Sequence, residues 1–126
     1  IYNNGSEKSL PLFFRHSAVR RAKFIERIFN MIKHIVCFKL KDNSSQKKQE
    51  AAEKLLSMEG KVPMIKAIEV GTDFLGSERS YDVILQVTLE SREMLDAYQN
   101  DEYHCGVVKP YMHAVREASV AIDYDI

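Results

Sequence analysis

Two aromatic side chains in the last third of the chain have types and a spacing that suit proton-transfer chemistry. Tyr98 lies on the apolar side of a predicted helix, and His104 follows six residues later, just past Asn100-Asp101. A break in the helix at this dipeptide lets both rings reach one cavity, which a straight helix would not allow at that spacing. An imidazole titrates near neutral pH and a phenol can polarise a carbonyl, so the pair suits enolisation or aldol chemistry. The competing interpretation is structural, with Tyr98 in the core and His104 bonded to backbone at a helix end.

His34 is the third candidate. It lies in an alternating segment and shares a face with Val36 and Phe38. Burying an imidazole without a hydrogen-bond partner costs roughly 1–3 kcal/mol, so a structural role is the first interpretation of His34. It gains functional interest because the same side of the sheet must face the helix that carries Tyr98. The residues expected to line a ligand cavity are therefore His34, Val36, Phe38, Leu85 and Val87.

Other chemistries lack their signatures. His34 and His104 could contribute to a metal site, but no carboxylate is placed to complete one, and Cys37 and Cys105 lack metal-ligand spacing. The sequence holds no glycine-rich phosphate loop, nucleophile elbow or dinucleotide fingerprint. We therefore expect neither a metal nor a cofactor.

The first half of the domain reads as a strand, a helix and a strand. Alternation of apolar and polar residues predicts a strand over 32–41. Helix-forming residues over 46–58 follow several N-capping side chains and end before Gly60, and a second strand is predicted over 64–70. The buried side of the helix is expected to consist of Ala52, Leu55 and Leu56.

The second half is also predicted to contain a strand, a helix and a strand. A third strand is predicted over 81–89, with its apolar face at alternate residues from Tyr81 to Leu89. Ser91 can cap the helix that carries Tyr98, and a short helical piece follows from Cys105 towards His113 despite Pro110. A last strand is predicted over about 116–125, with its inner face formed by Ala118, Val120, Ile122 and Tyr124.

This order, β-α-β-β-α-β, predicts a ferredoxin-like α+β fold with a four-stranded antiparallel sheet and helices on one face. The opposite faces of the strands are neither charged enough for free solvent nor apolar enough for a sealed core. We therefore predict a homodimer in which two such sheets meet face to face. The residues expected on that second face are Ile35, Cys37, Ile84, Gln86, Thr88, Ser119 and Ala121.

Composition narrows the class of protein. The chain of 126 residues is 45% hydrophobic and carries eighteen basic and eighteen acidic side chains. A balanced charge argues against nucleic-acid or membrane-surface binding, because both usually need a basic excess. Two cysteines are too few for a disulfide framework, so we expect a reduced, cytoplasmic protein.

Residues 1–30 differ from the rest, with six basic side chains against two acidic ones. Apolar residues over about 18–29 have helical spacing, which predicts a helix there. We interpret this segment as an N-terminal extension without chemistry of its own, and a functional arm is the alternative. The domain proper then covers 31–126.

Four stretches of this domain resemble the stress-responsive α/β-barrel domain, often called Dabb. They are the opening strand over 32–41, the third strand with the sequence YDVILQVTLES, the segment from Tyr98 to His104, and the closing Ile122-Asp123-Tyr124. The resemblance implies a ferredoxin-like subunit paired into a dimeric barrel, with a cavity between sheet and helices. It also implies likeness to polyketide cyclases of the olivetolic acid cyclase type, whose catalytic tyrosine and histidine match Tyr98 and His104 and whose strand histidine matches His34.

One departure from the family concerns the segment before His104. The family commonly reads Tyr-x-x-His-Pro-x-His, and here Asp101 and Glu102 replace the first histidine and the proline. Loss of the proline loosens the backbone before His104, and the two carboxylates would raise the pKa of His104 if they lay close to it.

Three functions follow as hypotheses. The first is a small-molecule-binding domain whose ligand is apolar or contains a carbonyl, without an assigned activity. The second is a cofactor-independent, cyclase-like enzyme in which Tyr98 orients a carbonyl and His104 is the general base. The third is a cofactor-free monooxygenase of the dimeric α/β-barrel type.

Overall fold

A computed structural model describes residues 30–126. The predicted helix over 18–29, and all of the extension except Asn30, lie outside the described residues.

Four strands form one antiparallel sheet in the order β2-β3-β1-β4. The first and last strands, β1 and β4, are neighbours in the sheet. Strands β2 and β4 form its two edges. The strands are β1 (Ile32–Leu40), β2 (Ile65–Thr72), β3 (Val83–Leu89) and β4 (Arg116–Asp125).

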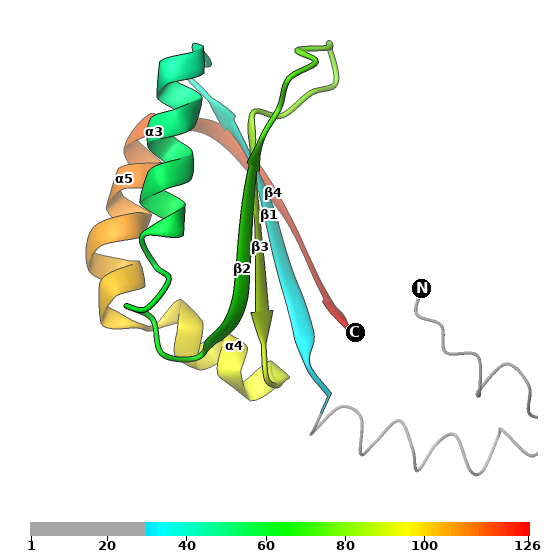
Figure 1. Cartoon of the computed structure of the whole chain (residues 1–126), viewed down its shortest axis with the longest axis vertical. Helices are drawn as coiled ribbons and strands as arrows, with labels where there is room; N and C mark the ends of the chain where they lie inside the picture. Colours follow the sequence, from blue (N-terminus) through cyan, green and yellow to red (C-terminus); the bar gives the residue numbers. More distant parts are fainter. Residues whose placement is uncertain (1–29) are drawn as a thin grey trace, which may run out of the picture.

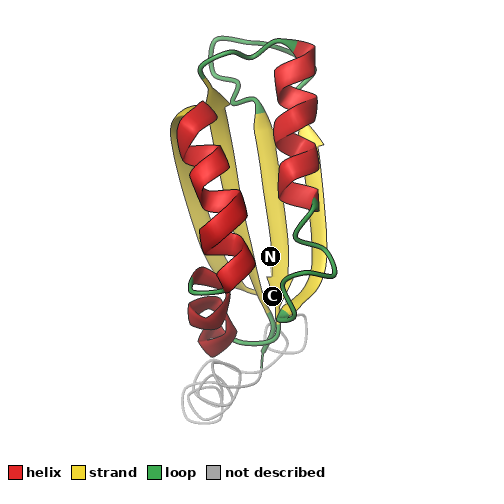
Figure 2. Cartoon of the chain, turned by 90° about the vertical axis from the view of Figure 1, so that its left-hand side faces the viewer, coloured by secondary structure: helices red, strands yellow, loops and turns green. Residues whose placement is uncertain are grey.

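The helices lie on one side of the sheet, and the other side is bare in the described part of the chain (Figures 1 and 2). This arrangement confirms the predicted ferredoxin-like α+β fold. The helical elements are α3 (Ser45–Leu56), α4 (Arg92–Gln99), the π-helix η1 (His104–Val108) and α5 (Lys109–Val115).

Helix α3 begins where the capping residues predicted it. The hydroxyl of Ser44 accepts a hydrogen bond from the Lys47 amide, which satisfies one of the free N–H groups of the first turn. The predicted buried side was right for Ala52 and Leu55 but wrong for Leu56, which is 40% exposed. Ala51 is buried in its place, because the side of the helix that faces the sheet is centred one residue earlier.

Strand β3 supplies the middle of the core. Alternate residues of this strand are buried, as the sequence predicted, and they face the helices. Strand β1 contributes its matching face from the neighbouring position in the sheet. These strand residues, with the helix and turn residues packed on them, form the core: Ile32, Phe38, Leu40, Ala51, Leu55, Met58, Val62, Val83, Leu85, Val87, Leu89, Tyr98, Val108 and Met112.

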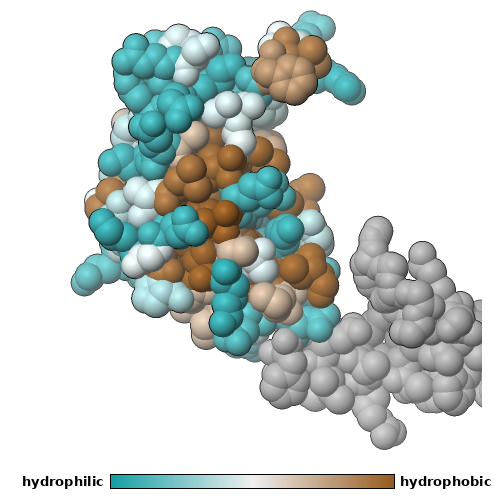
Figure 3. All heavy atoms as spheres, viewed as in Figure 1, coloured by the Kyte–Doolittle hydropathy of each residue, from teal (hydrophilic) through white to brown (hydrophobic). Residues whose placement is uncertain are grey.

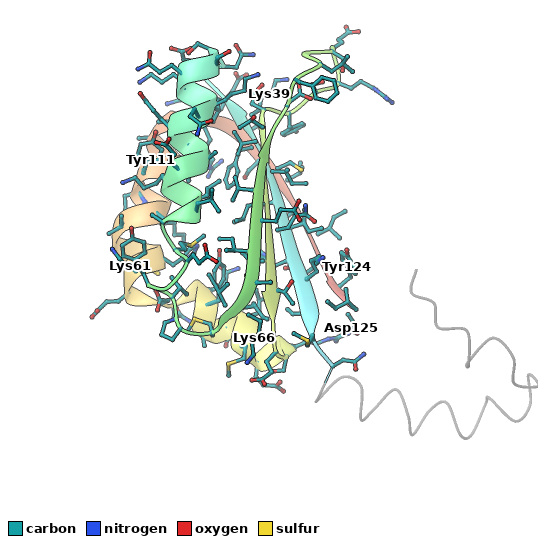
Figure 4. The ribbon with its side chains drawn as sticks, viewed as in Figure 1. Lys39, Lys61, Lys66, Tyr111, Tyr124 and Asp125 are labelled. Atoms are coloured by element: carbon teal, nitrogen blue, oxygen red, sulfur yellow. The ribbon has the colours of Figure 1, made fainter. Side chains whose placement is uncertain are left out.

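The predicted faces of β4 were wrong. In the register of the sheet Ile122 lies opposite Ile35 and Val120 opposite Cys37, so these residues point away from the helices. Tyr124 also lies on the side opposite the helices in Figure 4. The sequence predicts the more apolar set of β4 on the inner face, and pairing with β1 places it on the outer face instead.

The bare face is consequently more apolar than predicted. Instead of Ser119 and Ala121, strand β4 presents Val120, Ile122 and Tyr124 there, 51%, 67% and 45% exposed. The half-buried side chains of Ile35 and Cys37 lie beside them on β1. Three large apolar side chains in one row on an open sheet face are unusual for a surface that stays in water.

Candidate functional site

Tyr98 lies near the end of α4 and points into the space between the helices and the sheet. Its side chain is fully buried, 0% exposed, and its hydroxyl donates a weak hydrogen bond to Met58 Sδ at 3.7 Å. A thioether is a poor acceptor, so the hydroxyl retains most of its capacity to bind a ligand oxygen.

The chain between Tyr98 and His104 breaks as predicted, and Asp101 shapes the break. The Asp101 carboxylate accepts hydrogen bonds from the backbone amides of Tyr103 (2.9 Å) and His104 (3.0 Å). It therefore fixes the start of the next helical segment, where the family pattern has a histidine and a proline. The segment before His104 is therefore constrained even without the histidine and proline of the family pattern.

The helix that follows is widened. The Lys109 amide donates to the His104 carbonyl five residues earlier, which is the π-helical pattern. Pro110, the next residue, has no N–H to bond the residue four positions earlier. The predicted short helical piece is confirmed, as η1 followed by α5.

Three polar rings come together at this point. The ring centroids of Tyr98 and His104 are 4.6 Å apart, and those of Tyr98 and His34 are 5.4 Å apart in an edge-on arrangement. His34 reaches the group from β1, on the sheet side, while Tyr98 and His104 come from the helical side. The structure therefore brings the three predicted residues into one cluster.

Asp123 belongs to this cluster, although it was not among the predicted site residues. It lies opposite His34 in the β1–β4 register, and its carboxylate bonds the His34 Nδ1. This bond orients the His34 ring and supplies the partner that the burial of this histidine requires. Asp123 was missed because the predicted faces of β4 turned it outward.

Electrostatics give the two central rings different protonation properties. Burial, reinforced by the negative charge of Asp101, raises the pKa of Tyr98, so its phenol stays protonated at neutral pH. Burial lowers the pKa of His104; the Gln99 carbonyl opposes this, and the positive charge of Lys109 supports it. Asp101 acts in the upward direction on His104, as the sequence suggested, but burial outweighs it.

His104 is thus neutral near pH 7, and its buried Nδ1 has no hydrogen-bond partner among residues 30–126. A buried ring nitrogen without a partner in the protein is a position for a ligand atom or a water molecule.

A cavity of about 220 Å³ adjoins the cluster, between the sheet on one side and η1, α5 and the end of α3 on the other. Figure 3 shows a different apolar region, between α3 and the sheet on the face viewed in Figure 1. The cavity includes His34, Val36, Phe38 and Leu85 of the predicted lining set, but Val87 is sealed in the core and does not reach it. The complete lining is His34, Val36, Phe38, Leu55, Met58, Leu85, Tyr98, Gln99, His104, Val108, Lys109, Met112, His113, Arg116 and Ser119.

Within residues 30–126 there is no group of three or more His, Cys, Asp or Glu side chains arranged to hold a metal ion. Over the same residues, every helix is too short or too polar to cross a membrane.

The model of the stress-responsive A/B barrel domain, Dabb, matches residues 32–126, which is most of the chain and all of the described fold. The chain belongs to the Dabb family. No curated protein matches it in sequence.

Solved structures share the fold of this Dabb chain at low sequence identity. A dimeric protein of unknown function from Bacteroides fragilis has a TM-score of 0.65 and 23% identity, covering 78% of this chain and 99% of its own. A dimeric ferredoxin-like protein of unknown function from Thermobifida fusca has a TM-score of 0.66 and 19% identity, covering 78% and 92%. The hydroxynitrile lyase of Passiflora edulis has a TM-score of 0.64 and 20% identity, covering 77% and 94%.

Proposed function

We propose that this Dabb protein binds a small molecule in the cavity beside Tyr98, His104 and His34, and that it does so as a homodimer. The observation that carries the binding function is the cavity itself, with an apolar wall and a neutral imidazole, whose Nδ1 is unpartnered, beside a protonated phenol. Pockets that combine apolar walls with a few convergent polar groups are the usual form of small-molecule sites.

The polar groups specify the ligand further. A buried phenol O–H is a hydrogen-bond donor for a carbonyl oxygen, and the His104 ring can donate or accept according to its tautomer. The ligand that fits is therefore an apolar compound with a carbonyl or hydroxyl group near one end. The cavity has a volume of about 220 Å³, and its apolar walls are formed by Val36, Phe38, Leu55, Met58, Leu85, Val108 and Met112.

A variant that fills the cavity tests the binding function. Ser119 lines the cavity and is exposed at the β4 edge, so Ser119→Trp should fill much of the space while the fold is retained. Ala121→Trp is the matched control, because Ala121 lies two residues further along the same face and does not line the cavity. Thermal-shift measurements with aliphatic and aromatic ketones should show stabilisation of the wild type and of Ala121→Trp, and none of Ser119→Trp. Equal stabilisation of all three would place the ligand elsewhere and refute the proposal.

The same geometry supports a second function, proton abstraction next to a carbonyl. His104, neutral near pH 7, would take the proton from the α-carbon, and the Tyr98 hydroxyl would hydrogen-bond the developing enolate oxygen. The favouring observation is that the two rings are 4.6 Å apart and both line the cavity. The hydroxynitrile lyase from Passiflora edulis shares the fold, which supports the proposal of an enzymatic function.

Exchange of α-protons for deuterium in a bound ketone, followed by NMR, tests this function. Wild-type protein should catalyse exchange, whereas His104→Asn should abolish it and Tyr98→Phe should slow it. Ligand binding without exchange would leave the binding function and remove the catalytic one.

The homodimer is proposed from the bare sheet face. The row formed by Val120, Ile122 and Tyr124 offers an apolar surface that a second sheet would bury, and two proteins with the same fold are dimeric. Light scattering should give about twice the 14.5 kDa of one chain. Ile122→Lys should yield monomers, while Leu56→Lys, at an exposed apolar position on α3, should leave the dimer intact. A monomeric wild type would refute this part of the proposal.

A further inference from the structure

One wall of the cavity differs in charge from the others. Lys109, Met112 and His113 have the helical spacing that places side chains on one face of α5, and all three line the cavity. Arg116 and Ser119, at the start of β4, continue this wall. The sheet and α3 contribute mainly apolar side chains to the opposite walls.

The positive charges on this wall have no acidic partners among the described residues. No Asp or Glu side chain lines the cavity, and within residues 30–126 neither Lys109 nor Arg116 forms an ion pair. The positive charge of Lys109 already acts inside the site, since it contributes to the lowered pKa of His104. A cavity wall with two unpaired cations and a histidine presents a positive potential to any ligand.

The register of the sheet shows which residues lie at the two ends of the cavity. His34 marks one end, and four residues further along β1 Phe38 lies opposite Ser119, with Leu40 opposite Arg116 beyond it. Four residues of a strand span about 13 Å. The three-ring cluster and Arg116 are therefore at opposite ends of an elongated space, which at about 220 Å³ has the volume of about seven water molecules.

We propose that the ligand is an elongated carboxylic acid with an apolar body. Its carboxylate is held by Arg116 and His113 and attracted by the positive charge of Lys109, which lies nearer the rings, and its far end, with the carbonyl or hydroxyl group, lies beside Tyr98 and His104. This inference rests on the proposed binding function and adds the class of ligand. A medium-chain carboxylate fits the length, the volume and the charge of the cavity. An ion pair with a partly exposed cation strengthens binding modestly, so each of Lys109 and Arg116 should contribute about three- to fivefold in affinity.

Octanoate and octanamide test the inference, because they have the same shape and differ in charge. Isothermal titration of the wild type should show octanoate bound about tenfold more tightly than octanamide at low salt. Raising the salt concentration should reduce this preference by weakening octanoate binding alone, since salt screens partly exposed charges. The double variant Lys109→Gln/Arg116→Gln should bind both compounds about equally, with octanamide affinity unchanged.

Lys66→Gln is the matched control, because it removes one exposed positive charge from β2, away from the cavity lining. It should keep the wild-type preference for octanoate. If octanamide binds as well as octanoate in the wild type, or if the preference survives in the double variant, the charged wall does not hold the ligand, and the binding function stands without it. If a folded wild type binds neither compound, both this inference and the binding function for ligands of this shape are overturned.

Discussion

Removal of the Asp123 carboxylate should destabilise the domain through His34. Asp123→Ala leaves the His34 Nδ1 without its partner, and the His34 side chain is only 9% exposed against 39% for Asp123. A hydrogen bond to a charged group contributes about 1.5–3 kcal/mol when buried, and an exposed ion pair contributes less than about 1 kcal/mol. Because one partner is buried and the other half-exposed, we expect a loss of about 1–2 kcal/mol in the free energy of unfolding.

Urea unfolding at fixed protein concentration measures this loss, since the stability of the proposed dimer would depend on concentration. For a domain of this size, a loss of 1 kcal/mol lowers Tm by about 4–8 °C. Asp123→Asn, which keeps one carbonyl acceptor, should lose about half as much.

A double-mutant cycle separates this contact from other effects of the substitution. In a His34→Leu background, Asp123→Ala has no imidazole to leave unpaired, so it should cost less than about 0.5 kcal/mol. The coupling energy should therefore be about 1 kcal/mol. A coupling below about 0.3 kcal/mol would show that Asp123 does not support His34 and would refute the reasoning.

Four further outcomes are expected. Tyr98→Phe should change the free energy of unfolding by less than about 1 kcal/mol in urea titrations, because the hydroxyl loses only a weak bond to Met58. An NMR titration should give His104 a pKa below its ordinary 6.5, and Lys109→Gln should raise that pKa by removing a nearby positive charge. Because the unfolded chain protonates His104 more readily than the folded one, stability should fall as pH drops below about 6.5, and His104→Asn should lessen that fall. Asp101→Ala should cost about 0.5–2 kcal/mol by removing a cap from two amides, while Asp101→Asn should cost less.

Much of the candidate site could be predicted from local sequence. The convergence of Tyr98 and His104 depends on the polar break at Asn100-Asp101, and a helix break is a local feature. The orientation of His34 depends on alternation along β1, where Val36 and Phe38 fix the buried face. In these segments one side is clearly more apolar than the other, so periodicity and burial agree.

The protonation of His104 could not be predicted in the same way. The sequence places Asp101 and Glu102 beside it, which suggested a raised pKa. In the folded chain the Asp101 carboxylate binds two backbone amides, and burial between helix and sheet lowers the pKa of His104 instead. Burial depends on the whole chain, and no local pattern contains it.

In strand β4 the sequence determined some features and the tertiary structure decided others. Its sequence by itself determined that residues 116–125 form a strand and which residues share a face, because side chains alternate with a period of two. It did not determine which face turns inward, since Val120, Ile122 and Tyr124 are the more apolar set and yet lie on the bare side. Pairing with β1 decided that, by matching Asp123 to His34 and Ile122 to Ile35. The apolar-inward rule assumes one core per domain, and it fails on an edge strand whose second face is itself apolar and open to a partner.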